Sequence, residues 1–131
     1  MGFKSIAQAS LVAVALVGGA TFFLLRGRGG QCDAFAKATE KVALDTAYAS
    51  NQGGAAVVSS YPDRRAVLET MDVRDEQLQS YRRRYIALLE QHRDAAAALV
   101  EGREHYAQTR LTQLSESNTA LVDEINHYCK S

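Results

Sequence analysis

The chain has 131 residues, enough for one small domain and an appendage. Its 15 basic and 15 acidic residues balance, so the overall charge gives no reason to expect a nucleic-acid partner. Alanine, leucine, arginine, glutamate and glutamine are frequent, and there is one proline and no tryptophan. This composition favours helices, because such side chains lose little rotational freedom in a helical backbone.

An uncharged, apolar segment occupies residues 6–25. As a helix it would be about 30 Å long, the thickness of the hydrocarbon core of a bilayer. We expect residues 1–25 to form an uncleaved transmembrane signal anchor. A signal peptide cleaved after VGGA is the alternative, and a helix buried in the domain is a third interpretation. Residues 26–31 then form a basic, glycine-rich linker.

The rest of the chain, residues 32–131, predicts an all-α domain of about four helices. The first is expected at 32–49, with Phe35, Ala38, Val42 and Ala49 along its buried face. Ser60-Tyr61-Pro62-Asp63 has the hydroxyl cap and early proline that are typical of a helix start, so a second helix is expected at 61–71.

Two long helices are expected at 74–100 and 104–129, the first of them capped by Asp72. Their apolar positions step by three and four, and the second series is displaced by one residue from the first. The two series are Leu78, Tyr81, Tyr85, Leu88, His92, Ala95 and Leu99, then Ala107, Leu111, Leu114, Asn118, Leu121, Ile125 and Tyr128. This displacement favours a turn at Gly102 over one unbroken helix with a register skip. The helices then form an antiparallel hairpin that returns residue 129 to the start of the first of them.

The stretches LETMDVRDEQLQSYRRRYIALL (68–89) and LVDEINHYC (121–129) resemble small uncharacterised bacterial proteins, notably cyanobacterial ones. Those proteins have an N-terminal membrane or export segment and a helical domain with cysteines near both ends. The resemblance implies the same architecture here, and it implies no activity.

The two cysteines, Cys32 and Cys129, lie at opposite ends of the domain. We expect a structural disulfide between them, which in the chain-entropy model is worth about 4 to 5 kcal/mol for a loop of this length. Unrelated thiols, an intermolecular bond, and metal or redox chemistry are the alternatives. A stable disulfide requires an oxidising compartment such as the periplasm. The positive charges that follow residue 25 favour the cytoplasm instead, but domains of this length translocate largely regardless of charge.

Few residues suggest chemistry. Glu124 and His127 have the spacing found in di-iron bundles, but the sequence holds no second copy. His127 together with both cysteines would supply at most three zinc ligands. His92 lies on the apolar seam, where a lone histidine is usually a core residue, with a pH switch as the alternative.

The densest basic run is Arg82, Arg83 and Arg84. We expect it to be a solvated face paired with acids such as Asp75 and Glu76. The alternative is a surface that binds an acidic partner or anionic headgroups. Nucleic acid is excluded as a partner of the domain, because residues 32–131 hold 12 basic and 15 acidic side chains.

The sequence therefore predicts a non-enzymatic accessory or interaction protein without a metal or cofactor. It would cross the bacterial inner membrane once, place its helical domain in the periplasm or an equivalent space, and bind a protein partner or itself. The alternative is a cytoplasm-facing coiled-coil scaffold with free thiols. A small metal- or haem-binding bundle is the third hypothesis.

Overall fold

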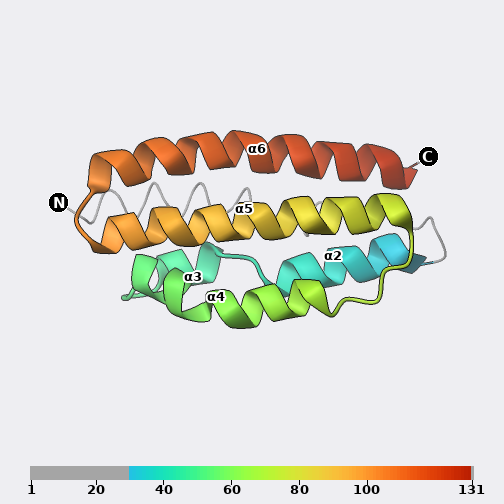
Figure 1. Ribbon diagram of the computed structural model, residues 1–131, viewed down its shortest axis with the longest axis horizontal. Coiled ribbons are helices and arrows are strands. Elements are labelled where there is room, and N and C mark those ends of the chain that lie inside the picture. Colours follow the sequence, from blue (N-terminus) through green and yellow to red (C-terminus); the bar gives the residue numbers. More distant parts are fainter. Residues whose placement is uncertain (1–29, 131) are drawn as a thin grey trace.

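A computed structural model describes residues 30–130, which contain five α-helices and no strand. The helices are α2 (Gln31–Lys41), α3 (Asp45–Ala49), α4 (Gly54–Glu69), α5 (Glu76–Val100) and α6 (Glu104–Lys130). Figure 1 shows α5 and α6 as a long hairpin, with α2 and α3 following one another along α4. The prediction of an all-α bundle that ends in a long hairpin is confirmed.

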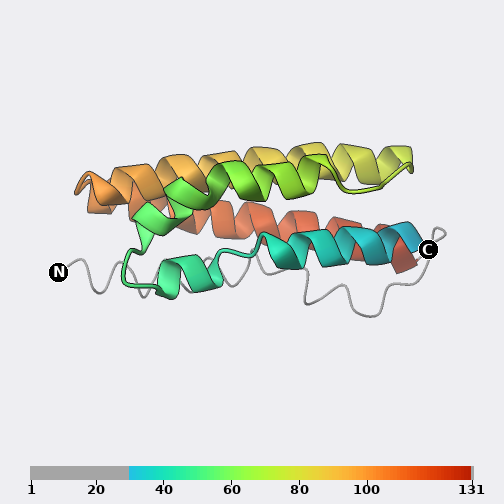
Figure 2. The same cartoon turned by 90° about the horizontal axis from the view of Figure 1, so that it is seen from below.

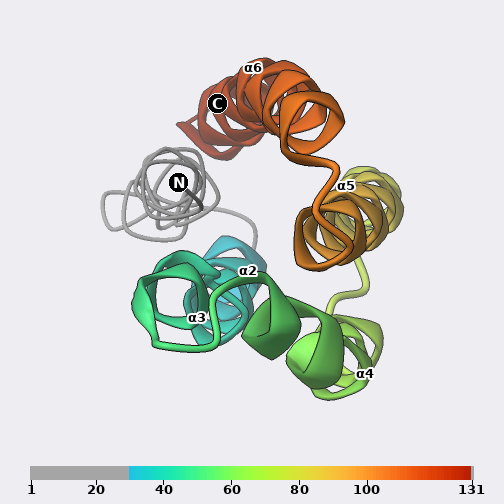
Figure 3. The same cartoon turned by 90° about the vertical axis from the view of Figure 1, so that its left-hand side faces the viewer.

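The helices pack on one another in chain order. α6 lies against α5, α5 against α4, and α4 against both α2 and α3. Seen from the end of the bundle, they follow one another around it in this order (Figure 3). The start of α2, the start of α5 and the end of α6 lie at the same end of the bundle (Figures 1 and 2). This arrangement brings the two ends of the domain together.

The predicted transmembrane anchor, residues 1–25, lies outside the described residues, as does most of the 26–31 linker. Within residues 30–130, no helix is both long enough and apolar enough to cross a membrane. The anchor therefore stays a prediction. The linker ends one residue earlier than expected, because Gln31 is already the first residue of α2.

The turn between α5 and α6 forms where the register displacement predicted it. Gly102 has φ +85°, a left-handed conformation that glycine adopts without steric cost. The apolar series of both helices are buried at every predicted position except the last of each, Leu99 and Tyr128, which are half-buried. Two facing stripes of this kind give the hairpin a continuous apolar contact.

The prediction of one helix over 32–49 is wrong. The helix ends at Lys41, and a second, short helix runs from Asp45 to Ala49. Val42 and Leu44 in the break are fully buried, and the Arg64 guanidinium donates to the carbonyl of Ala43. The break costs backbone hydrogen bonds of the helix. Burial of the Val42 and Leu44 side chains and the hydrogen bond from Arg64 to the Ala43 carbonyl offset this cost. Ala49, expected on the buried face, is exposed.

The second helix begins earlier than predicted, at Gly54 rather than near Tyr61, and it ends at Glu69 rather than 71. Pro62 lies inside it instead of in its first turn. Val57, Tyr61 and Leu68 are buried at helical spacing on both sides of the proline. Pro62 itself is exposed, so its ring does not interrupt the buried face of α4. Burial of the apolar face of α4 outweighs the preference of proline for the first turn of a helix.

The start of the third helix is also displaced. Asp75, not Asp72, is the N-cap of α5, and its carboxylate accepts a hydrogen bond from the backbone N–H of Leu78 at 3.0 Å. Asp72 is exposed and lies 3.8 Å from Arg74. Val73, between them, is buried in the core. Burial of Val73 holds residues 72–75 in a non-helical connection and moves the cap three residues along the chain.

Candidate functional site

The two cysteines form a disulfide at one end of the bundle. Cys32 lies in the first turn of α2 and Cys129 in the last turn of α6, with their Cα atoms 6.2 Å apart. Both are buried, with 1% and 4% of their surface exposed. Sequence alone left other states of these thiols open; the structure brings the two sulfurs together and joins α2 to α6, both of which also pack against α5.

Hydrogen bonds reinforce this end of the bundle. The Tyr128 hydroxyl donates to the carboxylate of Asp75, with oxygen–oxygen distances of 2.7 and 2.8 Å. The side-chain carbonyl of Gln31 accepts the backbone N–H groups of Arg74 and Asp75, both at 2.6 Å. The starts of α2 and α5 and the end of α6 are thus held by one group of contacts. We call the residues that form it the clasp: Gln31, Cys32, Asp75, Tyr128 and Cys129.

Sequence reasoning found the cysteines of the clasp but missed the roles of Gln31 and Tyr128. The sequence predicts Tyr128 on the apolar seam, and its ring packs edge-on against Tyr81, with centroids 5.9 Å apart. The acid that its hydroxyl reaches is 53 residues away in the sequence. No short-range pattern signals such a pair.

The three consecutive arginines differ in their contacts, and a binding surface formed by them stays a prediction. Arg82 donates to the backbone carbonyl of Met71 at 3.3 Å. Arg84 forms a two-pronged ion pair with Glu124 on α6, with N–O distances of 3.1 and 2.6 Å, and Arg83 is exposed. Pairing with acids was predicted, but the acid is Glu124 rather than Asp75 or Glu76.

The ion pair between Arg84 and Glu124 changes the acidity of both groups. Its hydrogen bonds lower the pKa of the Glu124 carboxyl and raise the pKa of the Arg84 guanidinium. Each side chain is about half exposed, at 47% and 49%. Water and salt screen such a pair, so it is worth less than about 1 kcal/mol. Its role is to align α5 and α6 rather than to create a reactive group.

A polar pair lies inside the hairpin. His92 of α5 and Asn118 of α6 are both buried, and the Asn118 amide nitrogen donates to His92 Nε2 at 3.0 Å. Burial lowers the pKa of His92 to about 4, because the low-dielectric core disfavours the charged ring. Within residues 30–130, neither His92 Nδ1 nor the side-chain oxygen of Asn118 has a hydrogen-bond partner. The His92 ring is therefore neutral at physiological pH, and the two buried atoms without partners lower the stability of the fold.

The candidate metal ligands of α6 and Cys32 have other contacts or face solvent. The carboxylate of Glu124 is paired with Arg84, His127 is exposed, and the two cysteine sulfurs are bonded to each other. Among the described residues, no group of three or more histidine, cysteine, aspartate or glutamate side chains is placed to hold a metal ion.

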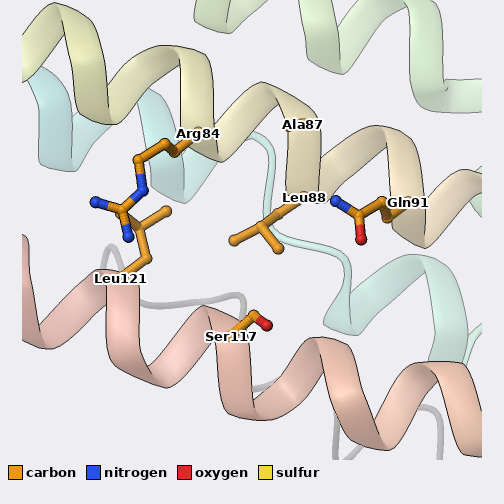
Figure 4. Close-up of a pocket in the computed structure, with 6 residues that line it drawn as sticks. All are labelled: Arg84, Ala87, Leu88, Gln91, Ser117 and Leu121. Carbon is orange, nitrogen blue, oxygen red and sulfur yellow. The ribbon is translucent and has the colours of Figure 1, made fainter.

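Two shallow grooves lie between helices of the described bundle. The first, of about 240 Å³, lies between α5 and α6 beside the Arg84 guanidinium (Figure 4). It is lined by Arg84, Ala87, Leu88, Gln91, Ser117 and Leu121. The second, of about 340 Å³, lies between α2 and α4, and we call it the lysine groove. It is lined by Ala34, Lys37, Ala38, Lys41, Val67, Thr70, Met71 and Asp72.

Comparison with protein-family models, with curated proteins and with solved structures finds no match for this chain. The resemblance to small exported bacterial proteins stays a prediction.

Proposed function

We propose that this protein is a membrane-anchored, non-catalytic helical module whose clasped bundle serves as an accessory or interaction domain in an oxidising compartment. The disulfide between Cys32 and Cys129 carries this proposal. Protein disulfides form and persist in the periplasm and in equivalent oxidising spaces, whereas cytosolic reductants keep most thiols reduced. An apolar segment of bilayer length, residues 6–25, precedes the bundle and supplies the anchor.

The way in which the polar groups are used supports an interaction role rather than catalysis. His92 faces Asn118 in the core and lines neither of the two grooves. Arg84 is engaged by Glu124. These contacts join helices to one another, and a catalytic acid or base would instead need access to a substrate. The surface of the bundle is left for binding.

The redox state of the two thiols in intact cells tests the compartment. Cells are quenched with acid, the protein is alkylated with a heavy maleimide before and after reduction, and the gel shift is read. We expect both cysteines to react only after reduction, in a protein that runs as a monomer without reductant. The Cys32→Ser variant is the control, because its remaining thiol should react at once in the same compartment.

Two free thiols in the unmodified chain would refute the proposal and favour the cytoplasm-facing coiled-coil scaffold. The anchor is tested separately by washing membranes with alkaline carbonate, which releases peripheral proteins but not spanning ones. The intact mass of the purified chain then distinguishes an uncleaved anchor from a signal peptide removed near residue 20. Release by carbonate, or a mass that lacks the segment, would contradict the anchor.

A further inference from the structure

The lysine groove combines an apolar floor with a positive rim. Val67 of α4 and Met71 of the connection that follows it are half-buried there, and Ala38 of α2 lines the same groove with only a methyl group. Lys37 and Lys41 line the groove and are exposed. Lys37 lies 3.1 Å from Asp33, but both side chains are more than half exposed, so that ion pair is weak and easily exchanged. The groove fits an apolar side chain accompanied by carboxylates.

A matching surface lies on the same chain, at the turn between α5 and α6. Val100 and Tyr106 are the large hydrophobic residues that the described part of the chain leaves exposed, at 57% and 47%. Glu101, Arg103 and Glu104 lie between them in the sequence. The Arg103 guanidinium stacks over the Tyr106 ring at 4.5 Å. We call residues 100–106 the acidic turn.

We propose that the acidic turn of one copy of this chain docks into the lysine groove of a second copy. The charges are complementary, since the groove offers two ammonium groups and the carboxylate of Asp72. The turn holds the carboxylates of Glu101 and Glu104, and the Arg103 guanidinium lies 3.7 Å from the Glu101 carboxylate in an exposed and therefore weak ion pair. Apolar side chains lie within each set, so docking removes exposed apolar surface from water while pairing the charges around it.

The positions of the two surfaces determine the kind of assembly. The acidic turn is at one end of the bundle, whereas the groove lies towards the clasp end (Figure 1). The contact is therefore heterologous, each copy keeps a free groove or a free turn, and the copies add head to tail. One turn in one groove is a small interface and hence a weak one. Confinement of anchored chains to a membrane raises their effective concentration, which favours a weak contact. In this respect the inference rests on the proposed function.

Covalent coupling of lysine to glutamate tests the contact between the lysine groove and the acidic turn directly. Full-length chains, one half labelled with ¹⁵N, are reconstituted together in lipid vesicles and treated with a carbodiimide, which joins an amine to a carboxylate with loss of water. We expect peptides that join Lys37 or Lys41 to Glu101 or Glu104, with mixed isotope composition because the bond links two chains. A ladder of coupled species, rather than a dimer alone, should accompany them.

Charge reversal provides the matched test. Lys37→Glu/Lys41→Glu and Glu101→Lys/Glu104→Lys should each lower the yield of the ladder by about tenfold or more, since like charges then face each other. An equal mixture of the two variants should restore the ladder, because each variant's altered surface now meets its complement. Arg83→Glu/Lys130→Glu and Glu116→Lys/Asp123→Lys change the charge equally at exposed positions elsewhere and should have no effect. Coupling in all variants is followed by gel with a photoreactive linker that inserts into C–H and N–H bonds, so that loss of a lysine or a glutamate is not mistaken for loss of contact.

Several outcomes would overturn the inference. The first is that the carbodiimide products of the unmodified chain lack mixed isotopes, so that no bond links two chains. The second is that the bonds between chains join other residues. The third is that the variants fold correctly but their mixture does not restore the ladder. The product map of the unmodified chain requires no substitution, so a variant that fails to fold leaves that test intact. Failure here would leave the thiol and carbonate results unaffected. The proposed function would then stand with a different partner.

Discussion

His92 and Asn118 place an imidazole and an amide between two apolar helices. Each buried polar atom without a partner lowers stability, and this pair contributes two such atoms within residues 30–130. The hydrogen bond between the two side chains offsets part of that cost only while both are present. Stability should therefore respond differently to single and double substitutions.

The His92→Leu variant should lose about 1 to 3 kcal/mol of unfolding free energy, because it leaves the Asn118 amide buried without its partner. The double variant His92→Leu/Asn118→Leu should recover most of this loss, since two apolar side chains then face each other. Urea denaturation of both variants measures the difference. Equal losses in the single and double variants would show that the hydrogen bond contributes nothing.

The stability of the protein should fall as the pH is lowered from about 6.5 to about 4, because of His92. Its pKa is lower in the folded chain than in the unfolded chain, so the unfolded state binds the proton first and is favoured in acid. The difference between the ordinary value of 6.5 and about 4 corresponds to roughly 3 kcal/mol at the acidic limit. Urea midpoints measured across this pH range should decline in the unmodified chain. In the double variant, the part of the decline that is due to His92 should be absent.

Among the helices, α4 depends on a close approach to α5 at its first residue. A Cβ atom added at Gly54 would lie 2.9 Å from the backbone carbonyl oxygen of Ala96 and 3.4 Å from Val100. Real Cβ atoms essentially never come so near to a carbonyl oxygen, and a backbone atom cannot turn aside as a flexible side chain can. Gly54 thus serves as a contact point between two helices.

The Gly54→Ala variant should lose about 1 to 3 kcal/mol of unfolding free energy, because α4 must shift away from α5. Alanine would otherwise stabilise a helix relative to glycine, so the direction of the change distinguishes the contact from helix propensity. Thermal unfolding followed by circular dichroism measures the effect. Ala55→Ser, at the adjacent exposed position, should change stability by less than about 0.5 kcal/mol. A more stable Gly54→Ala protein would contradict the contact.

The molecule as a whole is closed by the clasp. Its disulfide links residues that are 97 positions apart in the sequence and joins α2 to α6, both of which also pack against α5. The covalent bond therefore limits how far the unfolded chain can expand and keeps the two ends of the folded bundle together. The hydrogen bonds of Gln31 and Tyr128 hold the same end without a covalent link.

The Cys32→Ala/Cys129→Ala variant should remain helical but lose up to about 4 kcal/mol of unfolding free energy. The reason is the greater conformational entropy of the unlinked unfolded chain, and urea denaturation in the absence of reductant measures it. Tyr128→Phe removes one hydrogen bond from the same end and should cost about 1 kcal/mol. A variant without cysteines that is as stable as the parent would show that the noncovalent contacts suffice.

Sequence by itself determined the all-α class, the hairpin of α5 and α6 and the turn at Gly102. These features follow from local chemistry, namely a 3.6-residue period that lasts for many turns and a glycine between two registers. The break at Val42 and Leu44, the start of α4 and the cap at Asp75 were decided only by the tertiary structure. At each of these places, burial of an apolar side chain or a partner distant in sequence outweighed a local preference. The pairs Tyr128–Asp75 and Arg84–Glu124 are of the same kind, because residues 53 and 40 positions apart become neighbours only when the helices pack.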